Sequence, residues 1–162
     1  MHIPVDRSPD TITAALAAAE HVCASRGLRF TPMRRLVLEA LWRSEQPQGA
    51  YDLIGQLQRR LQRRLAPPTV YRALDFLMEQ KFVARIESRN AFVPCAHPDH
   101  DHTCVFFICA CCGTSAEIED PKVEALFAHQ AAALGFRIER RVVELQGTCA
   151  TCASTPDPTS AG

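Results

Sequence analysis

The chain has 162 residues, of which 47% are apolar and 22% charged, and this composition argues against a mostly disordered protein. No apolar run is long enough to cross a membrane and the alanine-rich stretch near the start lacks the basic flank of a secretory signal, so we expect a cytoplasmic protein with no membrane partner. The formal net charge of zero hides +5 in residues 1–90 and −5 in residues 91–162, which favours a nucleic-acid module joined to a different one over two ordinary halves with uneven surfaces.

The first half is predicted to be mostly helical, because helix start signals and helical spacing of apolar residues recur along it. Ser8 before Pro9 and Thr31 before Pro32 are typical helix starts, and Gly27 lies just past the end of the first helix. We expect helices at residues 9–26, 32–42, 51–64 and 68–80, followed by a β-hairpin over 82–95.

This order of elements is that of a winged helix-turn-helix, which reads DNA with the helix that precedes the hairpin. In that helix Thr69, Tyr71 and Arg72 project away from the apolar face. A hydroxyl, an aromatic ring and a guanidinium suit phosphate oxygens, thymine methyl groups and guanine edges. Further arginines precede it, Arg34 among them, and we expect this face to bind double-stranded DNA. The alternative is a solvated basic face.

The second half predicts a small α+β domain. Strands are expected at 104–109, 115–119 and 136–147, and a helix at 121–134. The Pro-, Ser- and Thr-rich end is expected to be disordered. We therefore divide the chain into a DNA-binding domain at 1–91 with a hinge to about 95, a second domain at 92–153 and a tail at 154–162.

Eight cysteines in a reducing compartment favour metal binding or redox chemistry over disulfides. Cys109 and Cys112 form one C-x-x-C pair, and Cys149 and Cys152 form another. Two such pairs make a closed tetrahedral site, which suits a structural Zn²⁺. A thioredoxin-like redox pair is the rival interpretation, but it needs only one C-x-x-C, placed where a strand turns into a helix.

The segment "CAHPDHDHTC" from Cys95 to Cys104 holds a surplus of metal ligands, including His97, His100 and His102. The four thiols of the C-x-x-C pairs already saturate one zinc, so a second site is predicted here. A cysteine among histidines and a carboxylate favours zinc over iron(II) or manganese. A hydrated loop whose histidines titrate freely is the alternative.

Four segments together resemble the ferric uptake regulator family of bacterial metal-responsive repressors, and within it the zinc uptake regulator branch. They are "TPMRRLVLEAL", "PPTVYRALDFLMEQKFVARIES", "CVFFICACCG" and "GTCATC", and the resemblance spans roughly residues 10–152. It implies a homodimer with an N-terminal winged helix and a C-terminal α+β dimerisation domain. It also implies structural zinc at the four C-x-x-C cysteines, and DNA contacts by Thr69, Tyr71, Arg72 and Tyr51.

The same resemblance implies a regulatory metal at the hinge between the two domains. When bound, this metal holds the two winged helices of the dimer at a spacing that fits a palindromic operator. Cys95, His102 and Glu117 match ligand positions of the zinc branch. Close relatives have a histidine in the wing where this sequence has Ala84, so the fourth ligand is expected to be His100 or, as second choice, His97.

We therefore expect a zinc-responsive repressor of zinc uptake and homeostasis genes, with one structural and one regulatory Zn²⁺ per chain. Such a protein is not an enzyme and has no small-molecule substrate. One alternative is an iron, manganese or peroxide sensor of the same family, although peroxide sensing requires iron among nitrogen and oxygen ligands, which Cys95 argues against. A remote alternative is a zinc enzyme, but no acid–base pair or nucleophile accompanies the ligands.

Overall fold

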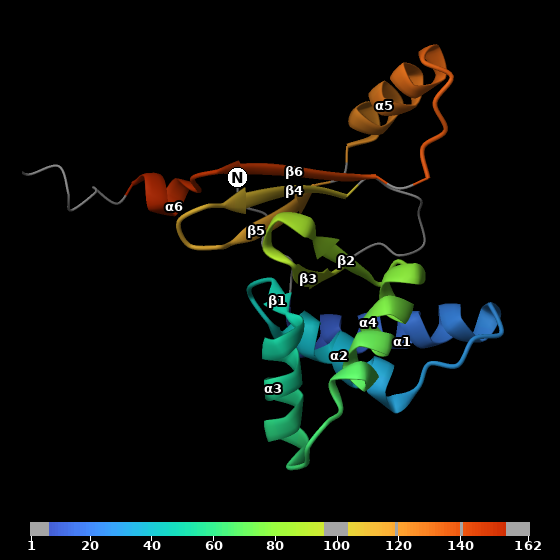
Figure 1. Cartoon of the computed structure of the whole chain (residues 1–162), viewed down its shortest axis with the longest axis vertical. Coiled ribbons are helices and arrows are strands. Elements are labelled where there is room, and N and C mark those ends of the chain that lie inside the picture. The colour runs from blue at the N-terminus through green and yellow to red at the C-terminus, as the bar shows by residue number, and fades with distance from the viewer. Residues whose placement is uncertain (1–6, 96–103, 119, 140, 155–162) are drawn as a thin grey trace, which may run out of the picture. The chain divides into compact units, whose positions relative to one another are not determined.

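The structure is a computed structural model of the chain and describes residues 7–95, 104–118, 120–139 and 141–154 (Figure 1). These residues divide into two compact units, one ending at Cys95 and the other beginning at Cys104. None of the described helices is long and apolar enough to span a membrane. His97, His100, His102 and nearly all of the tail lie outside the described residues.

Four helices begin where the sequence predicts, to within one residue. Two of them have the expected caps: Ser8 Oγ accepts from the Thr11 N–H at 3.3 Å, and Thr31 Oγ1 accepts from the Arg34 N–H at 3.4 Å. The helices are α1 (Pro9–Ser25), α2 (Pro32–Arg43), α3 (Ala50–Leu61) and α4 (Pro67–Glu79).

Helix α3 ends three residues earlier than predicted. Gln62 adopts a left-handed conformation with φ of 51°, and this stops the helix after Leu61. The predicted end at 64 followed the run of polar and basic residues, which are compatible with a helix and carry no stop signal. The consequence is a short irregular segment, residues 62–66, between α3 and α4.

The helices enclose one apolar core. Its fully buried members include Val37, Leu53, Leu57 and Leu74, which come from three different helices, and Cys23 joins it from α1 with 1% of its surface exposed. Because the inward faces of α3 and α4 are used for packing, the residues on their outward faces are free to meet another molecule.

A small antiparallel sheet completes the first unit. Strands β2 (Val83–Ile86) and β3 (Ala91–Pro94) form the predicted hairpin, joined by the short 3-10 turn η1 (Glu87–Arg89) and by Asn90 with φ of 48°. The two-residue strand β1 (Gln48–Gly49) pairs with β3, so the strand order is β1-β3-β2. Helices followed by this hairpin confirm the winged helix-turn-helix.

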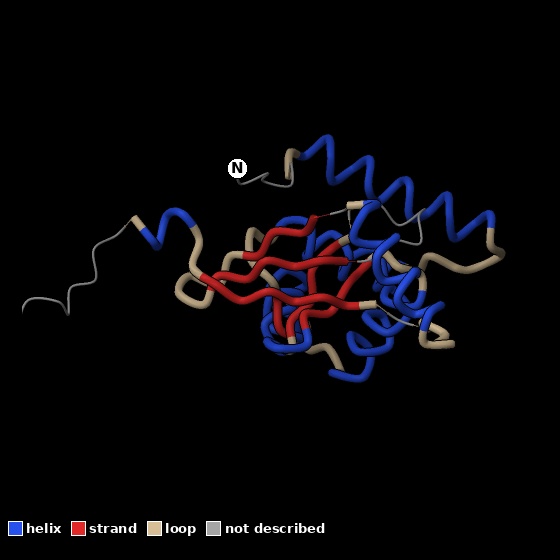
Figure 2. The backbone as a smooth tube through the Cα atoms, turned by 90° about the horizontal axis from the view of Figure 1, so that it is seen from above, coloured by secondary structure: helices blue, strands red, loops and turns tan. Residues whose placement is uncertain are grey.

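The second unit is the expected small α+β domain. Strand β4 (Cys104–Cys109) lies between β5 (Ser115–Ile118) and β6 (Val142–Gly147), and it pairs antiparallel with β5 but parallel with β6. Helix α5 (Pro121–Ala133) connects β5 to β6, and the short helix α6 (Ala150–Ala153) follows. Figure 2 shows the strands in red and the helices in blue.

The last strand is shorter than predicted. Alternation favoured a strand over 136–147, but pairing begins at Val142, which is opposite Cys104. Residues 136–139 have no paired strand among the described residues. An alternating sequence becomes a strand only where a neighbour can accept its backbone hydrogen bonds, and β4 supplies that neighbour from residue 104 onward.

Candidate metal centre and DNA-binding surface

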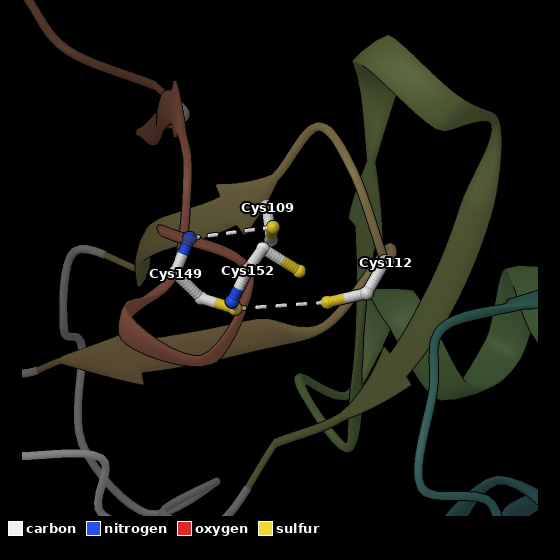
Figure 3. Close-up of side chains that lie close together, drawn as sticks. All are labelled: Cys109, Cys112, Cys149 and Cys152. Carbon is white, nitrogen blue, oxygen red and sulfur yellow. Dashed lines mark hydrogen bonds between the residues drawn. The ribbon is translucent and has the colours of Figure 1, made fainter. Parts of the chain in front are cut away.

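The structure brings the four C-x-x-C cysteines together at one end of the second sheet. Cys109 is the last residue of β4, Cys112 lies in the turn before β5, Cys149 is the N-cap of α6 and Cys152 lies within α6. Their sulfur atoms all lie within 4.8 Å of one another. Figure 3 shows the four side chains close together. The two pairs are far apart in sequence, so the sheet is what unites them.

Strand register explains the meeting of the two pairs. In the parallel pairing of β4 with β6, Cys109 is opposite Gly147, so the chain carries Cys149 to the same end. The Ala110 N–H donates to the Gly147 carbonyl at 2.8 Å, which extends this pairing into the turn. Gly113, with φ of 78°, closes the turn, because its N–H donates to the Cys109 carbonyl at 3.0 Å.

The sulfur geometry fits a tetrahedral zinc ion. Zinc–sulfur bonds of about 2.3 Å in a tetrahedron place the sulfur atoms about 3.8 Å apart. The Sγ atoms of Cys112 and Cys149 lie 3.8 Å apart. Four thiolates at this spacing would fill all positions around the ion and leave none for water or substrate.

The electrostatics of the cluster also favour a bound cation. Backbone N–H groups of Cys112 and Cys149 point at the Cys109 sulfur and lower the pKa of its thiol to about 5. The backbone N–H of Thr114 lowers the pKa of Cys112 as well. By contrast, the surrounding sulfurs, with that of Cys149 first, raise the pKa of the Cys152 thiol. Four neighbouring thiols therefore cannot all ionise by themselves, and a dication removes that conflict.

Cys111 lies in the same turn as Cys112 but is not part of the cluster. Its side chain is exposed. Its spacing to Cys109 already differs from that of a C-x-x-C pair, and the cluster consists of the four cysteines of the two C-x-x-C pairs.

The residues predicted for a regulatory site fall in different parts of the chain. Cys95 follows β3, is 5% exposed, and its N–H donates to the Phe82 carbonyl at 2.9 Å. Glu117 lies on β5 opposite Phe106, and its Oε1 atom is buried. Ala84 lies on β2 opposite Val93 and offers no donor atom to a metal. The histidines His97, His100 and His102 lie outside the described residues.

The predicted DNA-reading residues lie on the outside of the winged helix. Thr69, Tyr71 and Arg72 are exposed on the first turns of α4, while Val70 between them is fully buried. Tyr51 is 80% exposed at the start of α3. A ring this exposed contributes little to the apolar core.

Arg34, the remaining predicted DNA contact, has partners within the protein. Its guanidinium carbon lies 3.3 Å from the centre of the Phe76 ring on α4, and it donates to the carbonyl of Arg29. Phe76 is 7% exposed. A guanidinium stacked on a buried ring joins α2 to α4 and so helps to fix the position of α4.

Replacing Arg34 with methionine is therefore expected to lower the free energy of unfolding by about 1–2 kcal/mol, because a cation–π contact on a buried ring is lost. Urea unfolding measures this loss. The matched control is Arg35→Met, since Arg35 forms an exposed ion pair with Glu20 at 3.0 Å, and such pairs contribute less than about 1 kcal/mol. Equal losses in the two variants would contradict a positioning role for Arg34.

Comparisons with known proteins agree with these features. The sequence pattern of the ferric uptake regulator family matches residues 25–146. The chain is 43% identical over 143 residues to the zinc uptake regulation protein of Escherichia coli K12, covering 88% of this chain and 83% of that protein. The ferric uptake regulation protein of Campylobacter jejuni is 33% identical over 132 residues, covering 78% of this chain and 80% of that one.

A solved structure of a zinc uptake regulator complexed with zinc and DNA is also similar. It has a TM-score of 0.82 and 42% sequence identity to this chain, over 88% of this chain and 95% of that one. At this level of similarity, the winged helix and the sheet that carries the four cysteines correspond to parts of that protein.

Proposed function

Because the chain belongs to the ferric uptake regulator family, we propose that it is a zinc-responsive transcriptional repressor that binds palindromic operator DNA as a homodimer and controls zinc uptake and homeostasis genes. The observation that carries this proposal is the likeness, at 42% identity, to a zinc uptake regulator complexed with zinc and DNA. Such a repressor acts on chromosomal DNA in the cytoplasm and carries out no enzymatic reaction.

Each chain would hold two zinc ions with different tasks. The structural ion would be bound by Cys109, Cys112, Cys149 and Cys152, whose sulfur spacing fits tetrahedral zinc. The regulatory ion would be bound at the hinge by Cys95, His102 and Glu117. Its fourth ligand would be His100 or His97, because position 84 is alanine.

The regulatory ion would work by selecting a conformation. Without it, the winged helix (residues 1–91, with a hinge to about 95) and the dimerisation domain (92–153) sample many orientations, and only a fraction fit an operator. Ligands on both sides of the hinge, Cys95 and Glu117, join the two domains when zinc binds. A 100-fold gain in operator affinity requires only about 2.7 kcal/mol of coupling.

The DNA would be read by α4. Its exposed Thr69, Tyr71 and Arg72 suit the major groove and the adjacent phosphates, and Tyr51 of α3 would add a contact beside them. Two winged helices in a dimer address half-sites about one helical turn apart, which matches a palindromic operator.

The dimer interface would lie on the second unit. Phe107 and Leu145 are 47% and 45% exposed, and they are paired across β4 and β6, so they share one face of the sheet. Further exposed apolar side chains of this unit are Ile118, Leu126, Leu134 and Phe136. A unit that exposes this much apolar surface is completed by burying it against a second copy.

The alternatives have less support. An iron or manganese sensor does not explain the buried thiol of Cys95 at the hinge, because these metals prefer oxygen and nitrogen ligands. The identity to a ferric uptake regulation protein is also lower, 33% against 43%. A zinc enzyme needs an open coordination position and a general base. The four clustered thiolates close their own shell, and in the sequence no acid–base pair or nucleophile accompanies the proposed hinge ligands.

Metal-depleted protein supplied with zinc, iron(II) or manganese tests the proposal directly. We expect zinc at buffered physiological levels to restore operator binding by about 100-fold, while iron(II) and manganese at their own physiological levels restore less than a tenth of that gain. Fluorescence anisotropy with an operator duplex and a scrambled duplex measures the gain. Stronger rescue by iron(II) or manganese would replace the zinc assignment with one of the alternatives.

A further inference from the structure

The arginines of the winged helix divide into two groups that the sequence cannot distinguish. Several are engaged within the protein: Arg35 with Glu20, Arg43 and Arg60 with Glu39, and Arg26 with Gln80. Among the described residues, no side chain forms a hydrogen bond or an ion pair with the guanidinium groups of Arg59, Arg63 and Arg64. Their charges are therefore not neutralised by the protein.

The neighbours Arg59 and Arg60 show how the division arises. Successive residues of a helix point about 100° apart, so the two side chains leave α3 in different directions. Arg60 donates to both carboxylate oxygens of Glu39 at 3.1 Å. Burial alone would raise the pKa of Glu39, but the hydrogen bonds from Arg60 and Arg43 outweigh burial and lower that pKa. The charge of Arg60 is thus paired with Glu39 on α2.

Arg59 instead lies along the stripe that begins at Tyr51. Residues four apart share a helix face, so Tyr51, Gly55 and Arg59 form one line over a rise of about 12 Å. A side-chain carbon at Gly55 would lie 3.5 Å from the Arg59 Nη1 atom, so the arginine folds back over the glycine toward the start of the helix. Tyr51, at the other end of this line, is the exposed residue proposed to contact DNA.

Arg63 and Arg64 are held close to the start of α4. The Gln58 amide donates to the Leu65 carbonyl at 3.2 Å, and Leu65 is 7% exposed, so the segment between the helices is anchored directly after its two arginines. Arg63 and Arg64 themselves are exposed. Thr69 lies five positions after Arg64, which limits their Cα separation to about 18 Å, comparable with the width of a major groove and its flanking phosphates.

The surrounding sequence concentrates this charge. Residues 53–74 contain five arginines and no aspartate or glutamate. Arg72 is one of the five and belongs to the proposed base-reading helix, and Arg60 is bound to Glu39. The remaining three, Arg59, Arg63 and Arg64, lie on the last turn of α3 and in the segment that leads to α4, and none of them is paired with a described acid.

We propose that Arg59, Arg63 and Arg64 form a phosphate clamp that grips the DNA backbone outside the base-reading contacts of α4. This inference rests on the proposed function, because it assumes that α4 enters the major groove. The clamp contacts phosphates only, so it strengthens binding to operator and non-operator duplexes alike and contributes affinity without sequence preference.

The test compares two triple variants of the full-length zinc-bound protein that lose the same charge. The clamp variant is Arg59→Ala, Arg63→Ala and Arg64→Ala, and the control variant is Arg26→Ala, Arg35→Ala and Arg43→Ala. Binding to an operator duplex and to a random duplex is measured from about 0.05 to 0.4 M salt. Each phosphate contact contributes about 0.9 to the slope of log affinity against log salt.

A dimer carries two clamps, so the clamp variant is expected to have a slope shallower by about 2 to 5 on both duplexes, depending on whether one or all three arginines of each chain meet a phosphate. The control variant is expected to change the slope by less than about 1. Equal slopes for the two variants, or a loss confined to the operator, would overturn the clamp.

A lysine version of the clamp variant separates charge from folding. Because lysine also neutralises a phosphate, Arg59→Lys, Arg63→Lys and Arg64→Lys should restore the wild-type slope. Failure of this rescue would also overturn the proposal. Failure of the proposed function gives a different result: the wild-type protein would then show no zinc-dependent preference for the operator, while the slopes on the random duplex would still report on the clamp.

Discussion

Replacing Cys112 with serine is expected to reduce the zinc that survives chelation from about one ion per chain to nearly none, and to abolish operator binding. Serine removes one of four ligands, and the remaining three thiolates no longer close the shell. Since binding of a structural zinc is part of the folding free energy, the second unit should lose its cooperative melting transition and the dimer should dissociate. Zinc analysis, calorimetry and gel filtration measure the three effects.

Cys111→Ser is the matched control for this prediction. It changes the same residue type in the same turn, one position earlier, where the side chain is exposed and outside the cluster. This variant should keep its zinc, its melting transition and its operator affinity. If it loses zinc as completely as Cys112→Ser, the four-cysteine assignment is wrong and Cys111 is a ligand.

Replacing Cys95 with serine is expected to have the second largest effect, a loss of about 100-fold in zinc-dependent operator affinity, equivalent to about 2.7 kcal/mol of coupling. The zinc that survives chelation should stay near one ion per chain, because the structural site is unchanged. His102→Ala should give the same pair of results. Zinc-dependent operator binding that persists in both variants would refute the proposed regulatory site.

Position 84 offers a gain-of-function test of the same site. Ala84→His places a histidine on β2, at the position where the family resemblance implies a ligand. If His100 fills the fourth position in the wild-type protein, Ala84→His should restore the zinc response that His100→Ala removes. The same comparison is made for His97→Ala alone and for His97→Ala combined with Ala84→His. The histidine whose loss Ala84→His rescues is the natural fourth ligand. Operator titrations at buffered zinc concentrations measure both.

Local features of the fold were predictable from the sequence. Ser8 and Thr31 mark helix starts because their side chains cap exposed N–H groups, and the structure confirms both. The winged helix followed from helical spacing and from the hairpin around Asn90. These signals act between residues close in the chain, and for that reason a sequence pattern records them.

Long-range features were only partly predictable. The two C-x-x-C pairs predicted a shared site by chemistry, but the parallel pairing of Cys109 with Gly147 that brings them together leaves no local signal. The strand expected over 136–147 was wrong in its first part, since β6 begins at Val142, because pairing depends on where β4 begins. The different partners of Arg59 and Arg60 were likewise hidden, since adjacent arginines look equivalent until the position of Glu39 is known.

The parallel pairing of β4 with β6 imposes a delay during synthesis, because the two strands are far apart in the sequence. Cys149 follows Cys112 by 37 residues, and the partner strand β6 lies within that interval. At synthesis rates of about 5–20 residues per second, the first thiol pair leaves the ribosome roughly 2–7 s before the second. During that time the first thiol pair, Cys109 and Cys112, can supply two of the four metal ligands, and β4 lacks its neighbour β6. The four-cysteine cluster therefore cannot form, and β4 cannot complete its pairing with β6, until this last part of the chain has been synthesised.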